Sequence, residues 1–367
     1  MKKESANRRD FLSGQMVRSH IERTGEEIAN ALSETTAPSG GDTLRLTTRA
    51  MACDFSVIMN PSARNHVMDA SSVLDLIHEL ENQLTVYSED SEVSSINRLA
   101  VEQEVEVESQ LFQLLGLAQQ IHSETNNCFD LTAGPLIALW RKCREAQRIP
   151  TDDEINECLR HVGMEHLVLS EQNKTIRFLT SQTEINLGAI GKGYALDRAG
   201  ELTSSLGINS WLLHGGHSSV KAFGDHNGTG GWPVGLGNPL FTKQRLGTLL
   251  LKNQAMSTSG SNIQYFRCGG KRFGHILNPK TGWPAEGTLS VTVLAPSAAL
   301  ADALSTAFFV GGEPVAREYC ASHSEIGAIL IPFPHGDRRV EPTLIGVSPE
   351  QVFWDNDQIR AQAKSAD

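Results

Sequence analysis

Residues 186–197 read Asn-Leu-Gly-Ala-Ile-Gly-Lys-Gly-Tyr-Ala-Leu-Asp, and this stretch decides how we organise the rest of the chain. Three glycines within six residues, Gly188, Gly191 and Gly193, follow a predicted strand and precede a predicted helix. Such a turn exposes backbone N–H groups at a helix start, where a phosphate can bind, and Lys192 would add a positive charge. The spacing matches neither the dinucleotide fingerprint nor the P-loop. A turn whose glycines only permit close packing is the alternative, and this stretch alone leaves both open.

Outward from this stretch, the hydrophobic pattern switches between a period of two and a helical period, without a regular β-α-β repeat. The predicted strands cover residues 44–48, 55–59, 167–169, 175–178, 211–213, 246–251, 289–294 and 326–331. The predicted helices cover residues 73–80, 111–121, 154–162, 193–206 and 297–309. This order of elements predicts an α+β fold with mixed or antiparallel sheets and packed helices.

The composition is that of an ordinary globular protein with an acidic balance. The 367 residues are 40% hydrophobic and 20% charged, with a formal net charge of -11. This charge argues against nucleic-acid binding, because phosphate backbones require basic patches. A few backbone amides and one metal ion can still hold a pyrophosphate. The six cysteines form no C-x-x-C pair, which is typical of free thiols in a reducing compartment.

The chain divides into three predicted segments. Residues 1–42 are polar and end in a linker-like composition, so we expect an N-terminal arm. Residues 8–12, Arg-Arg-Asp-Phe-Leu, resemble a twin-arginine export signal, but Arg18 and other polar residues interrupt the apolar run that such a signal needs. We therefore expect a decayed signal or a chance match, a cytoplasmic protein and no transmembrane segment. A single domain over 43–345 and a C-terminal tail over 346–367 complete the prediction.

The helix predicted over 297–309 carries one carboxylate among apolar residues. Burying a carboxylate is costly unless it is paired or binds a cation. Asp302 and Thr306 stand four residues apart and share a helix face, and their oxygens suit a hard cation such as Mg²⁺. The alternative is an aspartate that interacts with the helix dipole and a threonine that bonds to its own turn. The spacing alone leaves both interpretations open.

Three further segments contain residues suited to a ligand site. Residues 214–217, His-Gly-Gly-His, follow a predicted strand, and the glycines would let a ligand approach the backbone. The two histidines could hold a metal, although isolated histidines are more often structural. Residues 257–260, Ser-Thr-Ser-Gly, offer three hydroxyls in an expected turn. The loop over 274–284 contains the turn-forming pairs Asn-Pro and Thr-Gly, and His275 in it is either a base or a structural histidine.

In this order, these segments resemble the ApbE family of FAD:protein FMN transferases from about Thr47 to Gly312. Further matching blocks are Leu-Thr-Val-Tyr-Ser-Glu-Asp-Ser-Glu at 84–92, Ser-Ser-Ile-Asn at 94–97, Phe-Asp-Leu-Thr-Ala-Gly-Pro-Leu at 129–136 and Leu-Trp at 139–140. Each block is weak by itself, but the match is strong because seven blocks stand in register: residues 84–92, 94–97, 129–140, 186–197, 257–260, 274–284 and 301–306. The resemblance implies a single T-fold-like catalytic domain over 43–345.

The resemblance also implies a metal and a set of catalytic residues. Mg²⁺ would be held by Asp302, Thr306 and the backbone carbonyl of Ala189. The candidate catalytic residues are His275 as the general base, Lys192 at the phosphates, and Asp302.

For the flavin nucleotide, the resemblance implies that Tyr87 stacks on the isoalloxazine ring and that Asn82 lies beside it. The remaining residues implied to bind FAD are Lys192, His214, Gly215, Gly216, Ser257, Thr258, Ser259, Gly260 and His275. The implied reaction is a metal-dependent transfer of FMN from FAD onto a Thr or Ser hydroxyl of a target flavoprotein, with release of AMP.

Several positions depart from the family pattern, among them Ser261-Asn262, where the family usually has an Asp or an aromatic residue. Asn186, His217 and Asn278 stand where the family usually has Asp. These changes imply either an altered nucleotide or target specificity, or a catalytically impaired protein that binds or delivers FAD. A metal-dependent FAD pyrophosphatase is a further alternative to the transferase. Because Asp302, Thr306 and Lys192 are retained, we favour covalent flavinylation of a protein.

Overall fold

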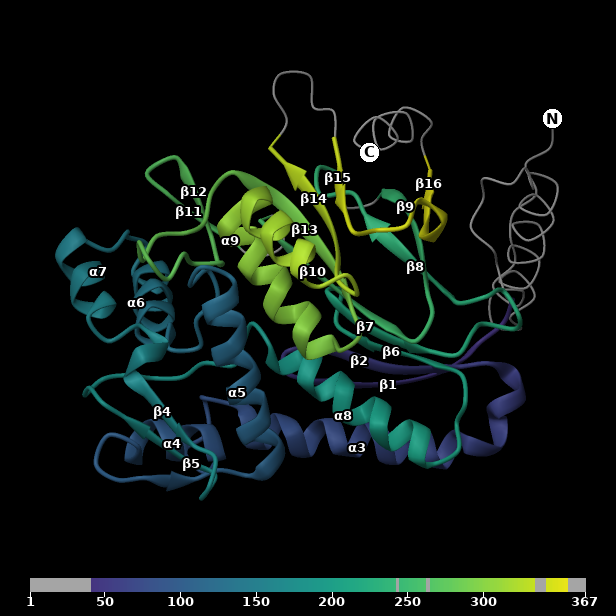
Figure 1. The fold of residues 1–367 in the computed structure, drawn as a ribbon, viewed down its shortest axis with the longest axis horizontal. Helices are drawn as coiled ribbons and strands as arrows, with labels where there is room; N and C mark the ends of the chain where they lie inside the picture. The colour runs from purple at the N-terminus through teal and green to yellow at the C-terminus, as the bar shows by residue number, and fades with distance from the viewer. Residues whose placement is uncertain (1–40, 242–243, 262–264, 334–340, 356–367) are drawn as a thin grey trace, which may run out of the picture.

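The computed structural model describes residues 41–241, 244–261, 265–333 and 341–355 (Figure 1). The predicted N-terminal arm, including the arginine pair at 8–9, lies outside the described residues except for its last two positions. No helix in the described part of the chain is both long and apolar enough to cross a membrane.

An eight-stranded antiparallel sheet forms the centre of the fold. Its strands, in spatial order, are β1 (Leu44–Ala50), β2 (Cys53–Met59), β6 (Trp211–Gly215), β7 (Ser219–Phe223), β10 (Gln254–Gly260), β13 (Thr288–Ala295), β14 (Gly327–Pro332) and β15 (Thr343–Ile345). All eight residues of β13 are buried, as expected for a strand covered on both faces.

Helices cover one face of this sheet (Figure 1). They are α3 (Val67–Leu84), α8 (Gly191–Ser205) and α9 (Ala298–Ser322), and α5 (Ser109–Glu124) packs against α9. α9 packs on β10 and β13, α8 on β6 and β7, and α3 on β1 and β2. The largest hydrophobic core lies between these helices and the sheet.

The opposite face is covered by a three-stranded sheet of β8 (Trp232–Gly237), β9 (Arg245–Leu251) and β16 (Val352–Trp354). A second hydrophobic cluster fills this layer and includes the buried rings of Trp232 and Trp354. β16 belongs to the segment that we expected as a tail, but it pairs with β9, so the chain stays part of the folded structure at least to Trp354.

The remaining elements form a lobe beside the central sheet and short connections. They are α4 (Glu92–Leu99), α6 (Gly134–Glu145), α7 (Asp152–Leu159), β3 (Val105–Glu106), β4 (Leu167–Ser170), β5 (Thr175–Phe178), β11 (Tyr265–Cys268), β12 (Lys271–Gly274), and the short 3₁₀ helices η1 (Pro61–His66), η2 (Met164–His166) and η3 (Pro349–Gln351). β3, β4 and β5 form a small antiparallel sheet, and β11 and β12 form a separate hairpin.

The predicted α+β class with antiparallel sheets is confirmed. Two local predictions were wrong. Residues 257–260 are not a turn but the second half of β10, because their backbone pairs with β13 and their hydroxyls find partners in the core. The helix predicted to end at 309 is continued by α9 to Ser322, across a break at Gly312 with a φ of 69°.

Candidate active site

The N-termini of α8 and α9 meet and cap each other. Ile190, at the start of α8, offers no side-chain cap; instead the N–H of Gly193 donates to Asp302 Oδ2 of α9 at 2.6 Å. In return, Asp197 of α8 accepts the N–H groups of Ala298 and Ala299 at 2.8 and 2.9 Å. Carboxylates at helix N-termini satisfy unpaired N–H groups and interact favourably with the dipole.

Only glycine permits this close approach. A Cβ atom on Gly193 would lie 2.1 Å from the carbonyl oxygen of Ala298. The glycine of this stretch therefore has a packing role, as the alternative interpretation held. Its N–H group also points at a carboxylate, so the turn orients donors toward negative charge as well.

Asp302 is 4% exposed and well supplied with donors. Its Oδ1 accepts the hydroxyls of Ser219 and Ser257, each at 2.6 Å, in addition to the Gly193 bond on Oδ2. A carboxylate offers roughly four lone-pair positions, so one on Oδ2 remains. Within the described residues no Lys, Arg or His forms an ion pair with Asp302.

Asp302 does not lie in the first turn of α9, which contains no acidic residue. The alternative that placed it at the start of its own helix was therefore wrong. The dipole that it faces belongs to α8.

A row of hydroxyls continues from Asp302 along α9 and β10. Ser259 Oγ lies 2.8 Å from Ser305 Oγ and 3.4 Å from Thr306 Oγ1. Ser257 and Ser259 alternate with Thr258, so their side chains face α9. The Thr258 hydroxyl lies on the other face of β10, 2.8 Å from Thr292 Oγ1. Ser259 and Thr306 are thus brought together with Asp302, and the Thr258 side chain is not.

Lys192 directly precedes Gly193, whose N–H donates to Asp302, and Cys53 of β2 lies close to Gly216. Burial raises the pKa of the Cys53 thiol, and the electrostatic effects of Lys192 and Asp302 also act on it. The thiol sulfur is 3.1 Å from where a Cβ on Gly216 would stand. Gly216, Lys192 and Asp302 therefore belong to one region of the molecule. Nothing in the sequence marked Cys53 or Ser219, which come from separate strands, as neighbours of Asp302.

Asn186 and Asn278 keep an acceptor where the family pattern has Asp. Asn186 Oδ1 accepts the N–H of Gly188 at 2.9 Å, in the turn that contains Ala189. Asn278 Oδ1 accepts the N–H of Lys280 at 2.9 Å. An amide oxygen makes these bonds as a carboxylate would, so the substitutions remove charge while the turns are retained.

A separate cavity of about 300 Å³ opens beside Tyr87. Its lining consists of Val86, Tyr87, Ser94, Asn97, Arg98, Gly134, Ile137, Ala138, Arg141, Glu184, Ile185 and Asn186. Tyr87 is 74% exposed, and the guanidinium carbon of Arg141 lies 5.2 Å from the centroid of its ring. Among the described residues, the lining includes Asn186 of the glycine-rich stretch but does not reach Asp302, Lys192, His275 or Asn82.

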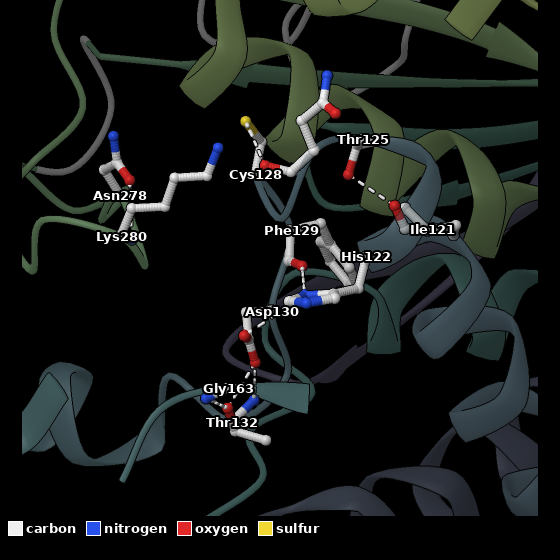
Figure 2. A network of polar contacts seen from close by, with 11 residues as sticks. Ile121, His122, Thr125, Cys128, Phe129, Asp130, Thr132, Gly163, Asn278 and Lys280 are labelled. Atoms are coloured by element: carbon white, nitrogen blue, oxygen red, sulfur yellow. Dashed lines mark hydrogen bonds and ion pairs between the residues drawn. The ribbon is translucent and has the colours of Figure 1, made fainter. Parts of the chain in front are cut away.

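Figure 2 shows a network of polar contacts around the buried Asp130 side chain, in the segment that precedes Gly134. Asp130 Oδ1 accepts the N–H and hydroxyl of Thr132 at 2.7 and 2.5 Å, and Thr132 Oγ1 in turn accepts the N–H of Gly163 at 2.6 Å. His122 Nδ1 lies 3.4 Å from Asp130 Oδ2. Burial raises the pKa of Asp130, although Thr132 and His122 oppose the shift. The network fixes the loop that leads to Gly134 in the lining.

His275 is exposed and follows β12 directly. The loop after it is compact: Gly282 N–H donates to Asn278 O at 2.8 Å, and Trp140 Nε1 donates to Gly282 O at 2.8 Å. His275 therefore stands at the edge of a well-anchored loop.

His214 lies in β6 and His217 follows this strand. Burial lowers the pKa of His214, which favours its neutral form, and His217 is exposed. Within the part of the chain that the structure describes, no group of three or more His, Cys, Asp or Glu side chains is placed to hold a metal. The predicted Mg²⁺ ligands are one carboxylate, one hydroxyl and one backbone carbonyl, so they are not a group of this type.

The chain is similar to known proteins in sequence and in fold. The model of the ApbE family matches residues 50–330. An FAD:protein FMN transferase of Klebsiella pneumoniae (strain 342) is 31% identical over 264 residues, covering 71% of this chain and 81% of that protein. An FAD:protein FMN transferase of Haemophilus influenzae is 28% identical over 299 residues, covering 79% of this chain and 85% of that protein. The crystal structure of the ApbE protein from Thermotoga maritima has a TM-score of 0.72 and 30% identity, covering 79% of this chain and 94% of that one. This chain therefore belongs to the ApbE family.

Proposed function

We propose that this protein is an FAD:protein FMN transferase, which moves FMN from FAD onto a Ser or Thr hydroxyl of an acceptor flavoprotein and releases AMP. The observation that carries the proposal is the buried Asp302, which lies at the N-terminus of α8 beside the hydroxyls of β10 and close to Lys192. The names of the matched relatives support it.

Asp302, Thr306 and the carbonyl of Ala189 would hold Mg²⁺. The set consists only of oxygens, which Mg²⁺ prefers. The remaining lone-pair position on Asp302 and the lack of an ion-pair partner among the described residues are consistent with a bound cation. When bound, Mg²⁺ would neutralise charge on the pyrophosphate of FAD.

The rest of the FAD would be held by the chain itself. Lys192 and the N-terminus of α8 would face the pyrophosphate. Tyr87 would stack on the isoalloxazine ring at the mouth of its cavity. The family resemblance also assigns Asn82 to the flavin, although Asn82 does not line this cavity. The remaining contacts with FAD would be made by Gly215, Gly216, Ser257, Ser259 and Gly260. Thr258 would contribute through its backbone, because its side chain faces Thr292.

In the reaction, the acceptor hydroxyl would attack the phosphorus of the FMN half. A new phosphorus–oxygen bond forms as the bond to the AMP half breaks, and His275 takes the proton of the hydroxyl. A base is needed because the pKa of an alcohol lies far above neutral pH.

One experiment separates this function from its two alternatives. The protein is incubated with FAD, Mg²⁺ and a candidate acceptor; the acceptor mass and the released AMP are then measured. A transferase adds one FMN to the acceptor for each AMP. A pyrophosphatase releases AMP and FMN without an acceptor, and a binding protein releases no AMP. We expect His275→Gln to slow transfer by roughly 10²–10⁴-fold, and EDTA to abolish it; transfer that is unaffected by EDTA would refute the metal assignment.

A further inference from the structure

The charge of the chain is unevenly distributed along its sequence. The 60 residues from His226 to Ala285 contain no Asp or Glu and seven Lys or Arg, in a protein with a net charge of -11. This segment includes β10 of the candidate site, the β11–β12 hairpin and His275. Where basic side chains of such a segment are exposed together, they favour a negatively charged partner.

The hairpin is anchored by aromatic side chains on one face. Phe266 and Phe273 are cross-strand partners and stack on each other with 5.3 Å between ring centroids. Both contact Trp140 of α6, at 6.0 and 5.7 Å. A two-stranded hairpin is marginal by itself, so this cluster is what holds it in place.

The opposite face of the hairpin presents Tyr265, Arg267 and Arg272, which we call the hairpin face. Arg267 and Arg272 stand directly opposite each other in the register, and like charges in that position repel. Their guanidinium carbons lie 5.9 and 3.8 Å from the centroid of the Tyr265 ring. All three residues are exposed. Within the described part of the chain, Arg267 has no carboxylate partner in an ion pair.

We propose that the hairpin face docks an acidic segment of the acceptor flavoprotein; this proposal rests on the proposed transferase function. Carboxylates would pair with the guanidinium groups, of which that of Arg272 also donates to the carbonyl oxygen of Ser261. Tyr and Arg are also the side chains that most often dominate binding at protein interfaces. β12 ends at Gly274, and the next residue in the chain is His275, the proposed base. An acceptor segment bound to the hairpin face would therefore lie close to this base.

The test uses two synthetic peptides of equal length with a central threonine, one flanked by glutamates and one by lysines, carrying the same dye. Binding to the FAD-loaded full chain is measured by fluorescence anisotropy at low salt. The glutamate peptide binds, the lysine peptide does not, and salt weakens binding. The double variant R267E/R272E weakens binding of the glutamate peptide by about tenfold or more, and R267Q/R272Q weakens it by less.

The control is R177E/K252E, which changes net charge equally at two exposed positions, on β5 and after β9. It leaves binding of the glutamate peptide within about twofold. Three outcomes overturn the proposal: no binding of the glutamate peptide by the native protein, equal weakening by the control, or unchanged binding in R267E/R272E. FAD affinity and thermal unfolding of R267E/R272E stay native-like, and a loss of FAD binding would also overturn it. Failure of the native protein to flavinylate any acceptor would instead count against the transferase.

Discussion

Asp302→Asn changes the charge of the central carboxylate while its shape is kept. The amide oxygen can still accept the hydroxyls of Ser219 and Ser257. The NH₂ group would then face the N–H of Gly193, where the carboxylate now accepts at 2.6 Å. We expect the loss of one charge-assisted hydrogen bond, about 2 kcal/mol of the free energy of unfolding, together with the loss of the only charged ligand proposed for Mg²⁺.

Asp197→Asn is the matched control. Asp197 caps α9 through Ala298 and Ala299 and forms an ion pair with Lys221 at 2.5 Å. Its loss also removes charge-assisted bonds from a helix N-terminus, so we expect a similar cost of about 2 kcal/mol. Asp197 has no place in the proposed metal set, so its variant keeps the Mg²⁺ dependence of the native protein.

Urea unfolding gives the two stability losses, and FMN transfer is measured across an Mg²⁺ titration. We expect Asp302→Asn to need far more Mg²⁺ or to lose transfer, and Asp197→Asn to behave as the native protein at temperatures where both are folded. Native transfer by Asp302→Asn at unchanged Mg²⁺ would show that Asp302 only caps α8. Equal loss of transfer in the two variants would assign both effects to the helix pair.

Three further variants test other parts of the structure. Gly193→Ala would place a Cβ 2.1 Å from the Ala298 carbonyl oxygen. We therefore expect urea unfolding to show that the free energy of unfolding falls by roughly 3 kcal/mol or more. Native stability of this variant would contradict the close approach. Tyr87→Ala removes the side chain of a residue that is 74% exposed, so the free energy of unfolding should change by less than about 0.5 kcal/mol. We expect the Kd for FAD, measured by a flavin-fluorescence titration, to rise about tenfold. An unchanged Kd would remove Tyr87 from the flavin site. The Arg148 bond lowers the pKa of Glu154 from 4.5 to about 2, so its contribution is present above pH 4.5 and is lost as pH falls toward 2. Glu154→Gln should therefore flatten the fall in stability over that pH window when unfolding is followed by circular dichroism, and parallel curves would refute it.

The parts of the fold that depend on local pattern were predictable. The apolar run of β13 and the helical period from Ser297 onward both lie where the sequence places them. The continuation of α9 beyond Gly312 was not, because the chain breaks its helical backbone there and then resumes it. Such a break is indistinguishable from a helix end unless the packing that continues the helix is known.

The candidate site was predictable only as a set of separate motifs. Ser257 and Ser259 look like turn residues in the sequence, and their strand conformation depends on β13 and on the carboxylate of Asp302. Arg141 directly follows a recognised block, yet no local pattern shows that it lies over Tyr87, 54 positions away. Contacts between distant segments are set by tertiary packing, which periodicity does not encode.

The mutual exchange of carboxylates between α8 and α9 has a dynamic consequence. Helix ends usually fray first, but here opening either end also removes a partner from the other, so the two ends should open as one unit. The amides of Gly193, Ala298 and Ala299 should then exchange with deuterium slowly and at matching rates, even before any nucleotide arrives. Folding alone would thus preassemble the anion-facing part of the enzyme, and nucleotide entry would have to rely on motion elsewhere in the molecule.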